Sequence, residues 1–287
     1  MATLTFEKPD CVPEDFLASP PQNASFHRID FTKTTDPLPE YKAHYAAVVD
    51  DLFTEEECNL LIHAAEQSTL SEQNKTPNWE VALVNVGGGM QKLIPEARSC
   101  SRIIWDTPWL ADRILSRILP FIKDPVELLR DVPHVTGPGP AKRGETWRLS
   151  RLNERLRFLR YHGGEYFHQH KDGCYVTPSG EEISFFTVHL YLNGEPSEQK
   201  SSKLSPDVYQ GTVERDELNS RPLRGGATTF YPPWNSDNNG SFPLYPKTGS
   251  VLIFQHKDLL HSGEEVLQGT KYTLRTDIMF RQDDSPQ

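Results

Sequence analysis

Paired cysteines are absent from this sequence of 287 residues. The chain has only four cysteines, and they lie far apart: Cys11, Cys58, Cys100 and Cys174. No CxxC pair occurs, which argues against a zinc finger, and so few dispersed cysteines do not indicate a disulfide framework.

Long apolar runs and clusters of basic residues are missing as well. No stretch approaches the roughly 18 apolar residues of a membrane-spanning helix, and the first residues, MATLTFEKPD, lack the apolar segment of a signal peptide. We therefore expect a soluble, intracellular protein in the cytoplasm, with no membrane partner. The formal net charge is −10 and basic residues are scattered among acidic ones, so no nucleic-acid partner is expected.

The amino-terminal part of the chain shows an irregular segment followed by a strand and a helix. Residues 1–43 are rich in proline, aspartate and threonine and have little periodicity, which predicts an N-terminal arm. Residues 44–53 read as a strand. Thr54 and Glu57 form the Thr-x-x-Glu signature of a capping box, and the apolar spacing that follows predicts a helix over 54–68.

The next segment alternates between predicted strand, helix and loop. Residues 79–86 resemble a strand. Thr107 and Pro108 suit the N-cap and first position of a helix, which we expect to end at Pro120. The glycine- and proline-rich stretch 131–146 is typical of a loop.

From about residue 155 the chain becomes rich in β-branched and aromatic residues, and its 18 glycines and 23 prolines suit a loop-rich β architecture. The polar segment 195–224 is an insertion that could form a lid or binding loop. Together these patterns predict a mainly β fold of the jelly-roll type, with supporting N-terminal helices on its outer face. The predicted strands are Leu156–Tyr161, Ile183–Leu192, Ala227–Phe230, Ser250–Phe254 and Lys271–Phe280.

A His-x-Asp pair, His170 and Asp172, lies in this β region. On a strand, residues two apart point to the same face, so an imidazole and a carboxylate would converge on one cation. A second imidazole from His261, or alternatively His256, would complete the two-histidine, one-carboxylate facial triad of non-haem iron oxygenases. The His-Glu-x-x-His motif of zinc hydrolases does not occur.

Histidine and aspartate two residues apart also occur by chance, so this pair by itself is also consistent with residues that bind no metal. His168 and His170 would then be polar surface residues, and His162 and His189 would be loop or packing histidines. His168 has no role that the pattern assigns.

The last predicted strand carries charged residues on one face. Lys271, Thr273, Arg275, Asp277 and Met279 alternate with the more apolar Tyr272, Leu274, Thr276, Ile278 and Phe280. This charged face could be the solvent side of an edge strand. If it instead faces the interior, Lys271 needs an anionic partner, because an unpaired buried cation is costly.

The chain resembles the prolyl 4-hydroxylase-type branch of the Fe(II)/2-oxoglutarate dioxygenase superfamily. The segment HYAAVVDDLFTEEECNLLIHAA (44–65) is similar to the lead-in to the catalytic domain of that family. Four further blocks, in the family's order, carry the resemblance: YHGGEYFHQHKDG (161–173), HLYLNGEP (189–196), GGATTF (225–230) and GSVLIFQHKDLLHSGEEVLQGTKYTLRTDIMF (249–280).

The resemblance implies a double-stranded β-helix (jelly roll) over residues 44–287, with a motif-bearing core at about 155–281. It implies that His170, Asp172 and His261 bind iron.

The resemblance further implies that Lys271 pairs with the distal carboxylate of 2-oxoglutarate, while Tyr161 and Tyr191 donate hydrogen bonds to this co-substrate. Arg275, on the same face as Lys271, could share the anion or contact the substrate. The insertion 195–224 is longer than the family minimum.

The resulting functional hypothesis is an Fe(II)- and 2-oxoglutarate-dependent dioxygenase that hydroxylates an unactivated C–H bond of a peptide or small molecule. O2 is the second co-substrate, succinate and CO2 are released, and ascorbate could serve as reductant. The alternatives are a catalytically inactive metal- or ligand-binding barrel of the same fold and a zinc-dependent hydrolase of the cupin type.

Overall fold

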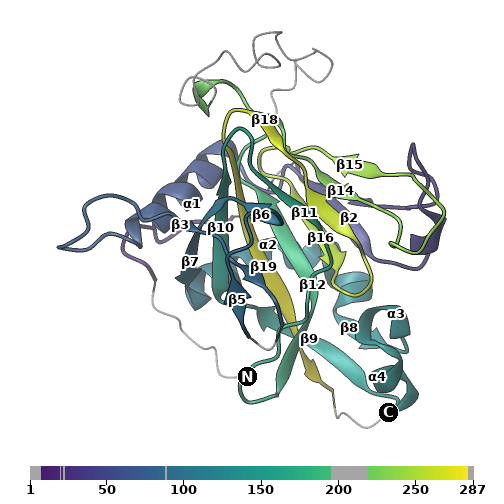
Figure 1. Ribbon diagram of the computed structural model, residues 1–287. Helices are drawn as coiled ribbons and strands as arrows, with labels where there is room; N and C mark the ends of the chain where they lie inside the picture. The colour runs from purple at the N-terminus through teal and green to yellow at the C-terminus, as the bar shows by residue number, and fades with distance from the viewer. Residues whose placement is uncertain (1–7, 20, 22, 88, 195–218, 284–287) are drawn as a thin grey trace.

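The computed structural model describes residues 8–19, 21, 23–87, 89–194 and 219–283, and most of its strands belong to two antiparallel sheets (Figure 1). The larger sheet has the order β1-β2-β16-β12-β19-β10-β7-β3, with β9 also paired to β19 and β8 paired to β9. The smaller sheet has the order β15-β14-β17-β11-β6. The predicted mainly β architecture is confirmed.

The elements have the following bounds. The helices are η1 (Pro39–Tyr41), α1 (Glu55–Gln67), α2 (Pro108–Val126), α3 (Pro133–Thr136) and α4 (Pro138–Lys142). The strands up to β10 are β1 (Ser25–Arg28), β2 (Ala46–Asp50), β3 (Glu80–Val81), β4 (Val84–Asn85), β5 (Gln91–Lys92), β6 (Arg98–Ser99), β7 (Ser101–Asp106), β8 (Leu128–Arg130), β9 (Thr146–Leu152) and β10 (Arg155–Tyr161). The later strands are β11 (Tyr166–His170), β12 (Glu182–Tyr191), β13 (Arg224–Gly225), β14 (Thr228–Phe230), β15 (Phe242–Leu244), β16 (Val251–Gln255), β17 (His261–Gly263), β18 (Val266–Gln268) and β19 (Lys271–Gln282).

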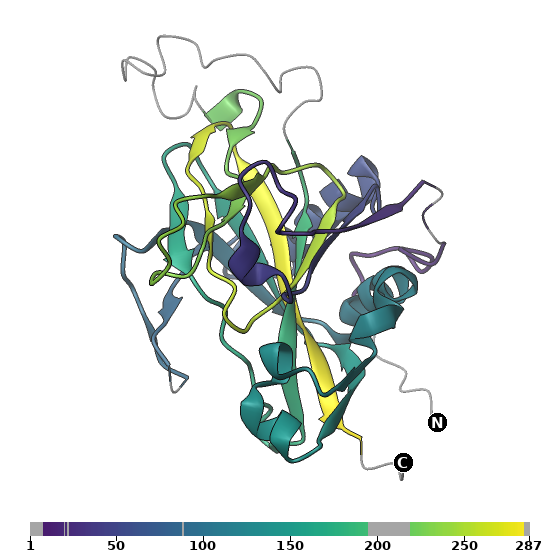
Figure 2. The same cartoon turned by 90° about the vertical axis from the view of Figure 1, so that its right-hand side faces the viewer.

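Strand β19 lies in the interior of the larger sheet and not at its edge. It pairs with β12 on one side and with β10 and β9 on the other, and Figure 2 shows it running through the length of the molecule. Its charged face is therefore enclosed, and the edge-strand alternative for residues 271–279 is wrong. The alternation of side chains along β19 places Leu274, Ile278 and Phe280 in the apolar core.

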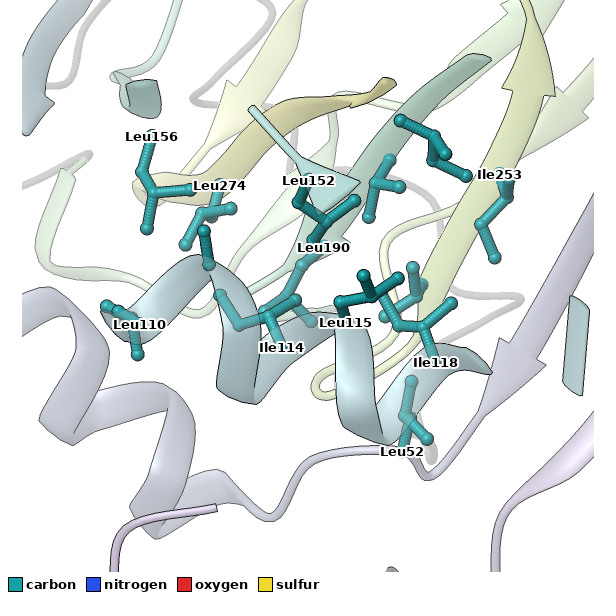
Figure 3. Packing of buried hydrophobic residues seen from close by; sticks show 14 of the residues in the cluster. Leu52, Leu110, Ile114, Leu115, Ile118, Leu152, Leu156, Leu190, Ile253 and Leu274 are labelled. Atoms are coloured by element: carbon teal, nitrogen blue, oxygen red, sulfur yellow. The ribbon is translucent and has the colours of Figure 1, made fainter. Parts of the chain in front are cut away.

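Helices α1 and α2 pack their apolar sides against the larger sheet. Ile114 and Ile118 of α2 belong to the same buried cluster as Leu190 of β12 and Leu274 of β19 (Figure 3). This contact covers one face of the sheet with hydrocarbon, so the other face of its central strands is left for polar residues.

The ends of these two helices test the sequence predictions differently. The capping box of α1 is confirmed, because the Thr54 side chain accepts from the Glu57 backbone and the Glu57 side chain accepts from the Thr54 backbone. The expected end of α2 at Pro120 is wrong, because the helix continues past this proline, and its backbone leaves the helical conformation only at a kink at Asp124 and Pro125, just before its last residue, Val126. Ile122 and Val126 are fully buried, and this packing outweighs the backbone hydrogen bond that a proline removes.

Two further expectations are corrected. Residues 79–86 form two short strands, β3 and β4, and not one continuous strand. The stretch 131–146 contains the short helices α3 and α4, each of which begins with a proline in its first turn. Of the insertion 195–224, residues 195–218 lie outside the described part of the chain, and the lid stays a prediction.

The described part of residues 1–43 packs on the domain. Strand β1 pairs with β2 at the edge of the larger sheet, and Phe31 packs edge-to-face on Tyr41 and Phe230. We propose a boundary at residue 44 between the N-terminal arm, residues 1–43, and the domain, residues 44–287. Among the described residues, no helix combines the length and hydropathy needed to cross a membrane.

Candidate metal centre

Three potential metal ligands meet where the smaller sheet faces the larger one. His170 ends β11, His261 begins β17, and the two residues are cross-strand partners. Asp172 lies two residues beyond the end of β11, so the prediction that both members of the His-x-Asp pair belong to the strand is wrong for Asp172. The ligand atoms of the three residues nevertheless all lie within 4.8 Å of one another.

The carboxylate of Asp172 stands between the two imidazoles. Its Oδ1 is 3.8 Å from Nε2 of His170, and its Oδ2 is 3.9 Å from Nε2 of His261. These separations suit atoms that share one cation and do not hydrogen-bond each other.

Backbone carbonyls fix the orientation of both imidazoles. Nδ1 of His170 is 2.8 Å from the His168 carbonyl oxygen, and Nδ1 of His261 is 3.1 Å from that of Leu259. A carbonyl only accepts, so Nδ1 carries the proton and Nε2 offers its lone pair. Burial lowers the pKa of His170 to about 3 and also lowers the pKa of His261, which keeps both rings neutral.

Asp172 is held by two side chains of the larger sheet. The Thr187 hydroxyl donates a hydrogen bond of 2.5 Å to Oδ2, and Nη2 of Arg275 lies 3.0 Å from Oδ1. Burial by itself would raise the pKa of Asp172, but Arg275 and the histidines outweigh it and hold the pKa well below its usual value. Asp172 is therefore an ionised carboxylate in a fixed position.

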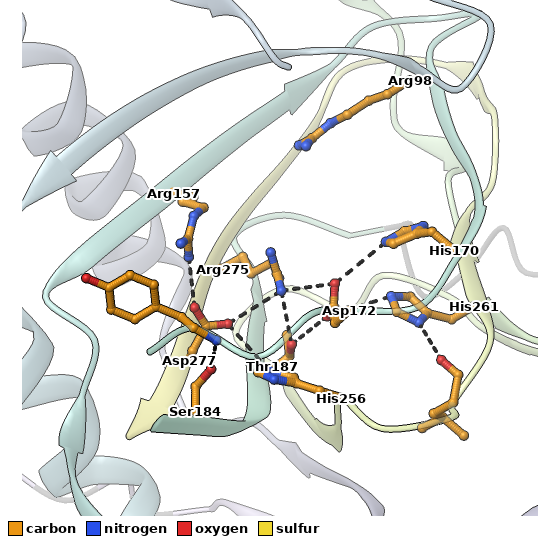
Figure 4. Close-up of polar contacts among 12 residues, drawn as sticks. Arg98, Arg157, His170, Asp172, Ser184, Thr187, His256, His261, Arg275 and Asp277 are labelled. Atoms are coloured by element: carbon orange, nitrogen blue, oxygen red, sulfur yellow. Dashed lines mark hydrogen bonds and ion pairs between the residues drawn. The ribbon is translucent and has the colours of Figure 1, made fainter. Parts of the chain in front are cut away.

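A second buried carboxylate, Asp277, joins the surrounding charges (Figure 4). It lies 3.1 Å from Nη1 of Arg157, 3.4 Å from Nη2 of Arg275 and 3.5 Å from Nε2 of His256. His256, the alternative third ligand, thus faces Asp277, and the group of potential ligands contains His261 instead.

Lys271 is a buried cation without a carboxylate partner among the described residues. Its side chain is 3% exposed, and Nζ donates a hydrogen bond of 2.5 Å to the Gly226 carbonyl. Burial lowers the pKa of Lys271 to about 8. A Cβ at Gly226, whose φ is +67°, would lie 3.0 Å from the lysine side chain, which explains why a glycine follows Gly225 at this close approach.

The triad and Lys271 line one pocket, which is partly open to solvent. Tyr161 also lines the pocket, and its ring centre is 5.4 Å from Nζ of Lys271. The Tyr191 ring centre is 5.7 Å from the same atom. The Tyr191 hydroxyl donates to Oγ1 of Thr228, itself a lining residue, so Tyr191 lies one side chain behind the pocket wall.

The remaining histidines have distinct environments. His168 is exposed and stacks on Tyr166 with ring centres 4.2 Å apart. His162 contacts the Thr270 hydroxyl. His189, predicted as a packing residue, instead lines the pocket. The residue is partly buried, desolvation holds its pKa well below the ordinary value, and its enclosed Nε2 has no hydrogen-bond partner among the described residues.

Thr187, His189, Arg157 and Arg98 are pocket residues that the sequence analysis missed. The sequence does contain a signal for Thr187 and His189, because they lie four and two residues before Tyr191 on β12 and so point to the same face of the strand. Arg98 comes from the two-residue strand β6, which no sequence pattern predicts.

No family model and no curated protein matches the chain. A viral collagen prolyl hydroxylase from Paramecium Bursaria Chlorella virus-1, in complex with 2OG, is a similar solved structure with 17% identity, 82% and 96% coverage of the two chains and a TM-score of 0.44.

Two further solved structures are similar to the chain. A prolyl hydroxylase from Trichoplax adhaerens, in complex with a hypoxia inducible factor peptide fragment, has 11% identity, covers 86% of this chain and 87% of its own, and gives a TM-score of 0.46. A 2OG-Fe(II) oxygenase family protein from Burkholderia pseudomallei has 11% identity, 80% and 81% coverage and a TM-score of 0.40. These three similar structures are thus two prolyl hydroxylases and a 2OG-Fe(II) oxygenase family protein.

Proposed function

We propose that the chain is an Fe(II)- and 2-oxoglutarate-dependent dioxygenase that hydroxylates an unactivated C–H bond and releases succinate and CO2. One observation carries this proposal: a His-Asp-His group lies in the same pocket as a buried lysine that has no carboxylate partner among the described residues. The first feature suits a metal, and the second suits an anion that binds beside it.

The donor set fits iron. His170 and His261 offer neutral imidazole nitrogens and Asp172 offers an ionised carboxylate, which is the ligand combination of the facial triad. Fe(II) bound to these residues would supply the redox chemistry by which O2 and a 2-oxo acid oxidise a substrate.

The protein's own residues orient these ligands and bind the co-substrate. Arg275 and Thr187 fix the Asp172 carboxylate, which positions it for the metal. We assign Lys271 to the distal carboxylate of 2-oxoglutarate, because a charge pair in a buried setting is stronger than one in water. Tyr161 lies within reach of the same anion. Tyr191 does not contact the anion directly in this arrangement, because its hydroxyl donates to Thr228, a residue that lines the pocket.

Arg275 fits a positioning role better than direct co-substrate binding. Its guanidinium contacts the carboxylates of both Asp172 and Asp277, so its charge is already compensated within the protein. Nε2 of His189, buried in the pocket wall without a partner among the described residues, is an additional group that a bound ligand would satisfy.

The alternative is a barrel that binds metal or ligand without catalysis. The same triad and buried lysine would serve this alternative, because they can hold a metal and an anion whether or not turnover follows. The substrate, a peptide or a small molecule, is not specified by the triad.

A turnover assay tests the proposal. Protein loaded anaerobically with Fe(II) is mixed with 2-oxoglutarate, ascorbate and O2, and succinate is measured by mass spectrometry without added substrate. We expect slow succinate formation that His261→Ala abolishes and that omission of ascorbate reduces. Binding of 2-oxoglutarate without succinate would support the inactive barrel, and absence of both binding and turnover would reject both functions.

A further inference from the structure

Among the residues that the structure describes, four cationic side chains line the pocket, in a protein whose formal net charge is −10. Two of them are paired: Arg157 contacts Asp277, and Arg275 contacts both Asp172 and Asp277. Lys271 and Arg98 have no carboxylate within ion-pair distance in the described part of the chain. The pocket therefore has two uncompensated positive charges, and 2-oxoglutarate places only one carboxylate away from the metal.

Arg98 is set into the pocket from the edge of the smaller sheet. Strand β6 pairs with β11 so that Arg98 is the cross-strand partner of Phe167. Its Nε donates to Sγ of Cys100 at 3.1 Å, and its Nη1 donates to the Leu83 carbonyl at 3.4 Å. The Tyr161 side chain, which also lines the pocket, is a further hydrogen-bond partner of Arg98. A guanidinium has five N–H donors, so these three neutral partners leave donors for a ligand.

The position of Arg98 is close to the metal side of the pocket. Its guanidinium lies 4.6 Å from the centre of the Phe167 ring, and that ring stacks on His170 with centres 3.6 Å apart. In Figure 4 no dashed line joins Arg98 to the residues around Asp172 and Asp277. Arg98 is thus one aromatic ring away from a metal ligand and outside the charge network that fixes Asp172.

Exposure separates the two uncompensated cations. Lys271 is almost fully enclosed, whereas Arg98 is only partly buried. An anion that enters first would reach Lys271 at the closed end of the pocket. A second anion that arrives from solvent would meet Arg98, whose planar fork suits bidentate contact with a carboxylate or phosphate.

We propose that Arg98 binds a carboxylate or phosphate group of the substrate and so selects anionic molecules for oxidation at this site. This inference rests on the proposed function, because it assigns Lys271 to 2-oxoglutarate. Among the described lining residues, four cations surround one carboxylate, that of Asp172, and this excess of positive charge attracts anions from solvent despite the acidic character of the whole chain.

Binding of simple aromatic anions tests this proposal. Full-length protein is loaded with Mn(II), which replaces Fe(II) and prevents turnover, and is saturated with 2-oxoglutarate. Benzoate, phenyl phosphate and the uncharged benzamide are then titrated, and binding is followed by broadening of their proton signals by the nearby Mn(II). We expect at least one of the two anions to bind roughly tenfold more tightly than benzamide.

Variants assign this preference to Arg98. Arg98→Gln is expected to weaken anion binding roughly tenfold, while Arg98→Lys, which keeps the charge, weakens it less. Arg113→Gln serves as the matched control, because Arg113 also lies over an aromatic ring, that of Trp109 on α2, and does not line the pocket. Circular dichroism checks that each variant is folded, and Arg98→Lys keeps the test valid if Arg98→Gln does not fold.

The outcomes separate this inference from the proposed function. Equal affinity of the wild type for anions and benzamide, or unchanged anion binding in Arg98→Gln, overturns the role of Arg98. Loss of 2-oxoglutarate binding in Arg98→Gln also overturns it, because Arg98 would then belong to the co-substrate site. Failure of 2-oxoglutarate to bind the wild type overturns the proposed function itself. Preference for benzoate over phenyl phosphate identifies a carboxylate substrate, and the reverse identifies a phosphate.

Discussion

The two faces of β19 have opposite chemistry although both are buried. Leu274, Ile278 and Phe280 face the helices in the apolar core. Lys271 and Arg275 face the pocket, and Asp277 lies beside Arg275. Burial of hydrocarbon stabilises the fold, whereas burial of charge costs free energy unless each charge is compensated. The comparison teaches that the helix side of this strand supports the structure and that the opposite side holds charged residues of the proposed site.

On the charged side, we expect the largest effect from replacement of Asp172, the proposed metal ligand between the two imidazoles. Asp172→Ala removes the carboxylate between the two imidazoles, and we expect Mn(II) affinity to fall by more than ~100-fold and succinate formation to disappear. Calorimetric titration with Mn(II) measures the first effect. Asp112→Ala, at an exposed position on α2, is the control and should bind Mn(II) as the wild type does. Wild-type metal affinity in Asp172→Ala would disprove the ligand assignment.

The opposite face should respond in stability and not in metal binding. Leu274→Ala leaves a cavity beside α2, and we expect the free energy of unfolding to fall by about 2–5 kcal/mol. Urea denaturation measures this loss, while Mn(II) titration of the folded variant should give an unchanged affinity. If the variant kept full stability but lost Mn(II) binding, the division between the two faces would be wrong.

Replacement of the buried lysine should separate ligand binding from stability on the charged face. Lys271→Met removes a cation that has no carboxylate partner among the described residues, so stability should stay the same or rise. The dissociation constant for 2-oxoglutarate should increase roughly 10–100-fold, as expected for loss of a hydrogen bond to a charged group. The exposed Lys92→Met provides the control. A large loss of stability without a change in 2-oxoglutarate binding would show that Lys271 is structural.

The pH dependence should be the smallest effect. The pKa of Lys271 is lowered to about 8 by burial, so the unliganded protein loses this charge as the pH rises above 8. Binding of 2-oxoglutarate should therefore weaken by up to about tenfold per pH unit from pH 8 upward. In Lys271→Met this slope should vanish, and a slope that persists would assign the titration to another group.

The lowered pKa of Lys271 also predicts the direction in which the free energy of unfolding changes with pH when no ligand is bound. The folded-state pKa of about 8 lies below the ordinary value of 10.5, so the unfolded chain binds more protons between these two values. The contribution of Lys271 to stability should thus rise from pH 8 to 10.5. Urea denaturation of wild type and Lys271→Met at pH 8 and 9.5 measures the difference.

Part of this arrangement could be predicted from the sequence, because it depends only on the spacing of residues within one strand or one helix end. The alternation on β19 places Lys271 and Arg275 on one face whatever the rest of the fold is. The capping box at Thr54 is likewise local. The extension of α2 past Pro120 could not be predicted, since it depends on the buried contacts of Ile122 and Val126 with distant elements.

The polar neighbours of the site show the same limit. Arginine and aspartate in a strand look the same in sequence whether they face solvent or each other, so the contacts of Asp277 with Arg157 and Arg275 could not be predicted. Arg98 reaches the pocket through pairing of β6 with β11, which joins residues 67 and 69 positions apart and leaves no periodic signal in a two-residue strand.

Calorimetric titration of 2-oxoglutarate into metal-free and Mn(II)-loaded protein tests the central claim most directly, namely that one metal and one buried lysine bind this molecule together. We predict that a single molecule binds per chain, that binding requires Mn(II), and that His261→Ala loses it. Equal binding with and without the metal, or no binding in either state, would contradict the account.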